Sequence, residues 1–380
     1  MNEKISAFLS ERIAANDFPS AVYLVAEKGE IVFHEALGSA VVTPEVIPAR
    51  LDTIYDLASL TKPLVTGLLS AQLIQEEGGI RLNESIREFY PYKFGQNLDR
   101  TFLQLATHTS GLEAWIPLYL RAVSRVTVPQ LIAEIEPVSQ PDSVVTYSDL
   151  NFLALQFTVE GNRIDDEAFY EIVDELGLGR TTFNPLAESR VGEIDRREIA
   201  ASEFGNEYEK QTCVEKGYLQ PPATARDTDR SEVFRDYQIW GEVHDGNAFF
   251  MGGVAGHAGL FSTAEEVFKI ALQFLPEHTR LLQPETCQLF RTNFTKGLNE
   301  DRSFAFQLAS TEGSTAGTKM SPESFGHNGF TGTSLWIDPV KDRIFVLLTN
   351  RTHNHPLPFA NINSIRRRFH DIAIEELDRR

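Results

Sequence analysis

The sequence predicts an α+β fold, an α/β sandwich whose antiparallel sheet is built from both ends of the chain. Strand-like runs lie near the N-terminus and return only from Phe304, whereas the long middle has mostly helical periodicity. Helices at the two termini would flank the sheet, and a large helical region would be inserted between its halves. We therefore expect a discontinuous sheet domain, residues 1-62 and 290-380, and a mainly helical domain, residues 63-289.

The N-terminal part of the sheet is predicted to be a hairpin that follows a short helix. The helix is indicated by apolar residues at helical spacing, namely Ile5, Phe8, Leu9 and Ile13. The β-rich runs Ala21 to Ala26 and Ile31 to Glu35 come next, and Glu27-Lys-Gly-Glu30 between them is typical of a hairpin turn. These two runs would supply the first strands.

The middle of the chain is predicted to be helical and rich in loops. Helical runs extend over Val128 to Ile135, Leu150 to Val159, Ala168 to Leu176 and Ala264 to Leu275. The segment 191-243 is polar and irregular, and it is too long for an ordinary connection. Such a segment is typical of a lid or a binding loop.

The C-terminal part is predicted to complete the sheet. Three strands are expected, over Phe304 to Leu308, His327 to Ile337 and Arg343 to Thr349. A final helix is indicated by an apolar face made of Ile362, Ile365, Phe369, Ile372 and Leu377. This helix would cover the sheet together with the N-terminal one.

The composition limits the partners that the protein can have. The 380 residues include 35 Lys and Arg against 54 Asp and Glu, a formal net charge of −19. Nucleic acid and anionic membrane surfaces are therefore not expected partners, whereas a small-molecule substrate is. No apolar stretch is long enough for a signal peptide or a membrane span, so we expect a cytoplasmic protein without membrane insertion. The oligomeric state stays open.

No cofactor and no metal are predicted. Cys213 and Cys287 do not form a Cys-x-x-Cys pair and are expected to be unpaired thiols. The nine histidines lack the spacing of a metal site, and the roles of His108 and of His244-Asp245 stay ambiguous. The glycine cluster 252–259 matches neither a dinucleotide-binding nor a phosphate-binding loop, and a tight loop near the site is the better interpretation.

Ser59 and Lys62 are the strongest catalytic candidates. They stand at the front of a helical run that Gly78-Gly79 would end. Residues three apart share a helix face, so the Lys62 amine can reach the Ser59 hydroxyl. A serine becomes a nucleophile when a base takes its proton, and a lysine can help if burial lowers its pKa. The alternative is a helix-capping serine beside a solvated lysine, because about one Ser-x-x-Lys is expected by chance at this length.

Two further segments carry weaker signals. Tyr147-Ser-Asp149 precedes a helical run, and a tyrosine beside a lysine can act as a proton shuttle. The alternative is a tyrosine packed at a helix start. Gly326-His327-Asn328-Gly329-Phe330 opens an apolar strand whose edge could present N–H groups to a substrate carbonyl. Here the alternative is a simple β-bulge.

Taken in order, these motifs resemble those of the serine β-lactamase and penicillin-binding-protein superfamily. The motifs are Ser59-x-x-Lys62, Thr107-His-Thr-Ser-Gly-Leu112, Tyr147-x-Asp149 and His327-x-Gly329. The likeness extends over nearly the whole chain. It is strongest to the class C β-lactamase-like branch, which includes family VIII carboxylesterases and muramyl-peptide amidases. The fold of that superfamily agrees with the layout of strands and helices predicted above.

The resemblance implies a role for each matching residue. Ser59 would be the acylated nucleophile, Lys62 its proton partner and Tyr147 the general base. The backbone N–H groups of Ser59 and Phe330 would form the oxyanion hole. The substrate would also meet the remaining motif residues, which are Asp149, His327, Asn328 and Gly329.

Two departures from the superfamily pattern bear on the substrate. Asp149 stands where the superfamily often has Asn, and His327 stands where β-lactamases have Lys. The resemblance therefore implies a serine hydrolase that cleaves small esters or amides, with only weak β-lactam acylation. The alternatives are an amidase or peptidase acting on peptidoglycan-derived muropeptides, and a catalytically silent binding protein with the same fold.

Overall fold

The computed structural model describes residues 2–160, 166–187, 194–219 and 233–380. Its centre is a seven-stranded antiparallel sheet. The strand order is β3 (Ile47–Pro48), β2 (Glu30–Val41), β1 (Ser20–Glu27), β10 (Arg343–Thr349), β9 (Ser334–Asp338), β8 (Phe325–Asn328) and β7 (Gln307–Leu308). The two ends of the chain meet where β1 pairs with β10, in a register from Ala21 opposite Thr349 to Glu27 opposite Arg343. The predicted fold class is confirmed.

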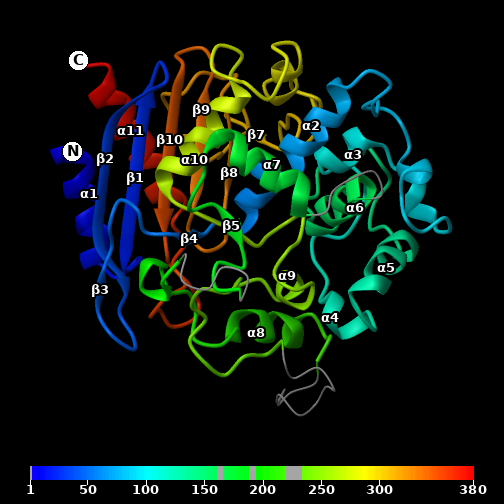
Figure 1. Ribbon diagram of the computed structural model, residues 1–380, viewed down its shortest axis with the longest axis horizontal. Coiled ribbons are helices and arrows are strands. Elements are labelled where there is room, and N and C mark those ends of the chain that lie inside the picture. The colour runs from blue at the N-terminus through cyan, green and yellow to red at the C-terminus, as the bar shows by residue number, and fades with distance from the viewer. Residues whose placement is uncertain (1, 161–165, 188–193, 220–232) are drawn as a thin grey trace.

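Alternation along the strands explains how the sheet holds a layer of helices on each face (Figure 1). Tyr23 and Val25 on β1 pack with helices α1 (Glu3–Ala14) and α11 (Asn363–Leu377) on one face. Val22 and Leu24, which point the other way, join the larger core around α10 (Ala264–Ala271) and the helical region. Side chains alternate along a strand, so a strand buried on both faces is apolar throughout.

The helical region supplies the other half of the molecule. It contains α2 (Leu68–Gln75), α3 (Phe102–Ala106), α4 (Leu118–Arg121), α5 (Val128–Glu134), α6 (Asp149–Glu160), α7 (Asp166–Leu176), α8 (Glu207–Glu215) and α9 (Gly246–Phe250). A small second sheet, in the order β4 (Tyr55–Asp56), β6 (Leu260–Ser262) and β5 (Thr182–Phe183), ties this region to the front of the Ser59 segment. The domain boundaries at 62/63 and 289/290 stay predictions.

Several predicted elements differ in their limits. The strand expected over His327 to Ile337 is two strands, β8 and β9, because Gly329 to Thr333 turns the chain back on itself. The expected strand over Phe304 to Leu308 is reduced to β7. Helix α2 ends at Gln75, where Glu76 becomes extended, although Gly78 does take the predicted left-handed conformation at φ +76°.

Part of the long segment 191-243 lies outside the described residues. Where it is described, it forms α8 and a short helical turn, Arg196–Glu198. Cys213 and Cys287 are both free and buried. Among the described residues, no helix is both long and apolar enough to cross a membrane.

Candidate active site

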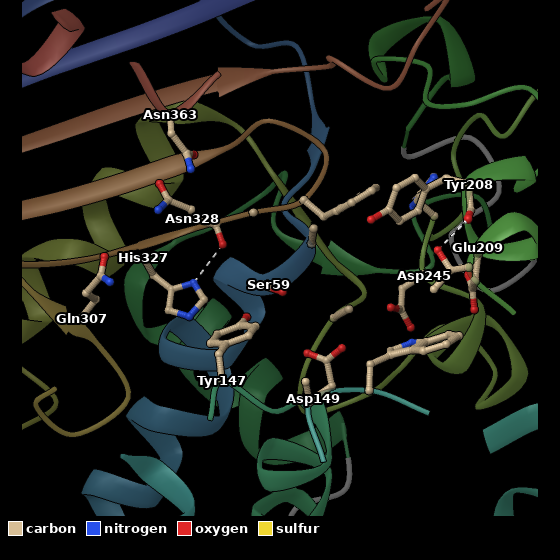
Figure 2. Close-up of a pocket in the computed structure, with 18 of the residues that line it drawn as sticks. Ser59, Tyr147, Asp149, Tyr208, Glu209, Asp245, Gln307, His327, Asn328 and Asn363 are labelled. Atoms are coloured by element: carbon tan, nitrogen blue, oxygen red, sulfur yellow. Dashed lines mark hydrogen bonds between the residues drawn. The ribbon is translucent and has the colours of Figure 1, made fainter. Parts of the chain in front are cut away.

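A cavity of about 640 Å³ opens between the sheet and the helical region. Its lining includes every candidate named from the sequence except Lys62, which lies fully buried beneath it. Figure 2 shows Tyr147 and His327 on one side of Ser59, and Asp149 and Asp245 on the other. The three motifs, which are far apart in the sequence, therefore meet at a single pocket.

The turn that carries Ser59 is held in an unusual backbone conformation. Ala58 has φ +47°, in the left-handed region that non-glycine residues rarely adopt. Asp56 fixes this turn, because its two carboxylate oxygens accept the N–H groups of Ala58 and His244, each at 2.8 Å. Ser59 then sits in a short 3₁₀ turn that runs into a π-helical turn, Lys62–Gly67. Such π-helical turns are frequent at functional sites.

Lys62 is wholly buried and directs its ammonium group at three acceptors. Its Nζ donates to Ser59 Oγ at 2.9 Å and to the carbonyl oxygen of His257 at 3.1 Å. It also forms an ion pair with Asp149 Oδ1 at 2.7 Å. An ammonium group has three donors, and here each has a partner.

The expectation that burial lowers the pKa of Lys62 is wrong in its net direction. Burial does favour the neutral amine, but the Asp149 carboxylate and Tyr147 outweigh it and raise the pKa of Lys62 above its ordinary value. The physical reason is the ion pair with Asp149, which removes most of the cost of burying the charge. Lys62 therefore holds its proton at neutral pH.

Tyr147 lies at the start of α6 and is enclosed by two imidazoles. Its ring centroid is 4.7 Å from that of His108 and 5.6 Å from that of His327. His108 fixes this segment, because its Nδ1 accepts the N–H of Ser148 and contacts the Asn151 amide, both at 3.1 Å. Figure 2 shows the phenol of Tyr147 directed toward Ser59.

The turn between β8 and β9 brings backbone N–H groups beside Ser59. A Cβ atom on Gly329 would come within 2.5 Å of the Leu57 carbonyl oxygen, so only glycine permits this close approach. Thr331 and Thr333 donate from their hydroxyls to the carbonyls of Asp56 and Leu57, which fastens the two turns together. The N–H of Phe330 has no acceptor among the described residues.

His327 is buried and neutral. Burial, together with Arg302 and Lys62, lowers the pKa of His327 well below its usual value. Its Nδ1 lies 3.0 Å from the Asn328 carbonyl oxygen, to which it donates. The Asn328 amide is held in turn by the Thr315 hydroxyl. Position 327 therefore presents no fixed positive charge to the pocket.

The pocket has two walls of opposite charge. We call Asp149, Glu209 and Asp245 the acidic wall and Arg302, Arg351 and Arg366 the basic wall. In the basic wall, burial and Arg351 lower the pKa of Arg366 to about 9, which leaves it charged at neutral pH. In the acidic wall, burial and Asp245 raise the pKa of Glu209 to about 7.

The acidic wall also contains the one potential metal-ligand group found among the described residues. Asp149, Asp245 and His257 place ligand atoms within 4.8 Å of one another. Their capacity is used internally, because Asp149 pairs with Lys62 and Asp245 Oδ1 lies 2.9 Å from His257 Nε2. This cluster therefore belongs to the network that surrounds Lys62.

Several residues at the site were not identified from the sequence. His108, His244 and Asp245 were ambiguous, His257 lies in the glycine cluster interpreted as a tight loop near the site, and Arg302 was not proposed. His108 lies inside the Thr107 to Leu112 motif, which is a signal that could have marked it. Arg302 comes from an irregular segment without periodicity, and no sequence signal marks it.

Comparisons with known proteins identify the family of the chain. A family model described as "Beta-lactamase" matches residues 5–367. A protein of Escherichia coli strain K12 with the provisional name D-alanyl-D-alanine carboxypeptidase is 29% identical over 366 residues, covering 89% of this chain and 79% of that protein.

Two solved structures show the same fold. One is the octameric penicillin-binding protein homologue from Pyrococcus abyssi, with a TM-score of 0.69 and 17% identity over 98% of this chain and 77% of that one. The other is EstCE1, a hydrolase with promiscuous acyltransferase activity, with a TM-score of 0.69 and 17% identity over 98% of both chains. At these identities the likeness establishes the fold alone.

Proposed function

The chain belongs to the beta-lactamase family, a family of serine hydrolases, and on that premise we propose that it forms an acyl-enzyme on Ser59. The observation that carries the proposal is the contact between Lys62 Nζ and Ser59 Oγ at 2.9 Å, at the floor of a pocket that Tyr147 also lines. A nucleophile, a charged partner and a proton acceptor within one cavity are the parts that acyl transfer needs.

In this proposal Tyr147 is the general base and Lys62 stays an ammonium. Lys62 already donates to Ser59 Oγ, so it cannot take the serine proton and instead stabilises the oxygen as that proton leaves. The proton passes to the Tyr147 phenolate while Ser59 Oγ bonds to the substrate carbonyl carbon. Tyr147 then returns the proton to the leaving alcohol or amine as the carbonyl–leaving-group bond breaks.

The oxyanion would be received by the N–H groups of Ser59 and Phe330. The β8–β9 turn supports this role, since Arg366 Nη2 holds the carbonyls of Gly329 and Thr333 at 2.8 and 2.9 Å. In deacylation, water gives its proton to Tyr147 and its oxygen to the acyl carbon. The Ser59 ester bond breaks, the proton returns to Ser59 Oγ and the free acid leaves.

Small neutral esters or amides are the substrates that we propose first. The neutral His327 and the Asp149 carboxylate give the immediate surroundings of Ser59 little attraction for a β-lactam carboxylate. The aromatic side chains of Trp115, Tyr208 and Phe330 also line the cavity and offer apolar surface to an acyl group. We therefore expect weak β-lactam acylation beside faster ester turnover.

A peptidase or amidase acting on peptidoglycan-derived peptides is the second candidate. It is supported by the provisional carboxypeptidase name of the Escherichia coli relative. The basic wall supports it as well, because guanidinium groups favour a substrate with a free carboxylate. A silent binding protein is disfavoured, since Ser59, Lys62 and Tyr147 are all present and meet at the pocket.

A substrate panel distinguishes these candidates. Purified protein would be given p-nitrophenyl acetate, a penicillin, and peptides that end in D-Ala-D-Ala with a free or an amidated carboxyl group. We expect turnover of the ester to exceed that of the penicillin in kcat/KM, with Ser59→Ala as the matched control. Preferred cleavage of the free-carboxyl peptide would favour the second candidate. No Ser59-dependent turnover of any member would contradict both.

A further inference from the structure

The ring of Tyr147 lies between two cations as well as two imidazoles. Lys62 Nζ is 5.0 Å from the ring centroid and Arg302 Cζ is 5.4 Å from it. The two histidine rings, those of His108 and His327, occupy the remaining contacts at 4.7 and 5.6 Å. These four side chains come from four different segments, so the enclosure of Tyr147 is built by the tertiary structure.

Two of these neighbours, Lys62 and Arg302, are positively charged, and each is paired with a carboxylate. Burial together with Arg302 and Lys62 lowers the pKa values of both His108 and His327, so neither imidazole is charged at neutral pH. The Lys62 ammonium is paired with Asp149 at 2.7 Å, and the Arg302 guanidinium is paired with Glu300 at 3.0 Å. Arg302 differs in keeping a buried donor, Nη1, without a hydrogen-bond partner among the described residues.

Arg302 is held in a way that leaves its charge directed at Tyr147. Only 3% of its surface is exposed, and its Nη1 has no hydrogen-bond partner among the described residues. Its Nε lies 3.0 Å from a carboxylate oxygen of Glu300, which offsets part of its charge, while Nη1 stays unpaired. A buried guanidinium with an unused donor is costly unless an anion forms beside it during function.

We propose that Arg302 is a positioning residue that stabilises the negative charge of the Tyr147 phenolate. It would thereby supply the cation that position 327 lacks, from a different segment of the chain. This inference rests on the proposed function, because it assigns Arg302 to the general base of that reaction. No atom of Arg302 needs to contact the substrate, and no proton passes through it.

The test removes the positive charge at position 302 and places one at position 327. Arg302→Met removes the guanidinium while keeping an extended side chain, and Arg302→Lys keeps the charge. The double variant Arg302→Met/His327→Lys returns a cation to a different position beside the same ring. For each variant, kcat/KM for a neutral ester would be measured from pH 5 to 10, with thermal unfolding as a check of folding.

Arg302→Met should move the rising limb of the profile to higher pH by about one unit, a loss of about tenfold at pH 7. Arg302→Lys should keep the limb near its wild-type position. The double variant should move the limb back toward lower pH, which a purely structural role of Arg302 would not produce. If Arg302→Met fails to fold, His327→Lys alone should move the limb to lower pH by adding a second cation.

Two failures are distinguishable. If Arg302→Met lowers the rate equally at every pH and His327→Lys restores nothing, the inference is wrong while the proposed reaction stands. If Tyr147→Phe keeps the wild-type rate and profile, then the base is not Tyr147 and the proposed function itself fails at that step. The same set of profiles therefore answers both questions.

Discussion

The acidic wall and the basic wall of the pocket handle buried charge in different ways. In the acidic wall each carboxylate has a polar partner close by, as Asp149 has in Lys62 and Asp245 has in His257. In the basic wall, Arg302 and Arg366 keep buried nitrogen atoms without partners among the described residues. The acidic wall keeps one unused acceptor, Glu209 Oε1, whereas the basic wall keeps unused donors on two of its three arginines.

This difference bears on the roles that we propose for the residues at Ser59. Asp149 favours the ammonium form of Lys62, and in the proposed reaction Lys62 therefore stabilises charge. The proposed proton acceptor is Tyr147, and Arg302, with Cζ 5.4 Å from the centre of its ring, would support its negative charge. The two walls together assign the roles of the Ser59 site, and each prediction below alters one of them.

Removing the nucleophile between the two walls should have the largest effect. Ser59→Ala should lower ester turnover by a factor of at least about 10³, because no other group can form the acyl intermediate. Steady-state kinetics with p-nitrophenyl acetate would measure it. Turnover within tenfold of wild type would mean that both walls surround a site that is not the reactive one.

Variants of Tyr147 and Lys62, the two residues next to Ser59, should lose nearly as much activity. Tyr147→Phe and Lys62→Ala should each lower kcat by about 10²–10³, since one removes the base and the other the charge that stabilises the serine oxygen. The double variant should be little worse than either single one, because the residues act as a unit. Losses that multiply in this double-mutant cycle would show independent roles.

Asp149→Asn tests whether the acidic wall sets the charge of Lys62. Without the carboxylate, burial dominates and the pKa of Lys62 should fall, because the ammonium loses its nearest anion. A neutral lysine can accept the serine proton, so Tyr147→Phe should cost only about tenfold in this background. An unchanged cost of Tyr147→Phe would show that Asp149 does not decide which residue is the base.

A cation added at position 327 tests the charge on the side of Ser59 that lies opposite Asp149. His327→Lys should raise the ratio of penicillin acylation to ester hydrolysis by about tenfold, because the neutral imidazole is replaced by a charge that attracts the β-lactam carboxylate. The ratio of the two kcat/KM values is the measurement. An equal change in kcat/KM for the two substrates would mean that the charge at position 327 does not select between them.

Glu209→Gln should have the smallest effect, and this effect is on the stability of the fold. Burial and Asp245 raise the pKa of Glu209 from 4.5 to about 7, so the folded state holds a proton that the unfolded chain releases. Its contribution is therefore present below pH 4.5 and lost as the pH rises through about 7.

Glu209→Gln removes this dependence. The difference in free energy of unfolding between the variant and the wild type should change in favour of the variant by roughly 1–2 kcal/mol as the pH rises from 5 to 8. Urea unfolding at the two pH values would measure the difference. If the free energies of unfolding of the wild type and the variant depend on pH in parallel, the pKa of Glu209 is not raised in the folded protein.

The sequence was sufficient for the elements whose information is local. Ser59 and Lys62 are three residues apart, so their contact follows from helical geometry alone. The antiparallel sheet follows from alternating apolar runs, and β10 has the predicted limits, Arg343 to Thr349. The strand expected across Gly329 failed because its threonines favour a strand while its glycines permit the tight turn that forms.

The charges of the site could not be derived from the sequence because they depend on distances across the fold. Asp149 is 87 positions from Lys62 in the sequence, yet its carboxylate lies 2.7 Å from the Lys62 amine and raises the pKa of Lys62. Arg302 reaches Tyr147 from an irregular segment whose path no periodicity describes. Motifs predicted which residues meet, and tertiary packing decided their protonation.

The central claim is that Ser59 is acylated in the pocket between the two walls. Intact-protein mass spectrometry after brief exposure to a fluorophosphonate tests it most directly, followed by peptide mapping of the labelled residue. We expect one added group per chain, located on Ser59, absent in Ser59→Ala and added more slowly in Tyr147→Phe. A label of the same extent in Ser59→Ala, or one mapped to another residue, would contradict it.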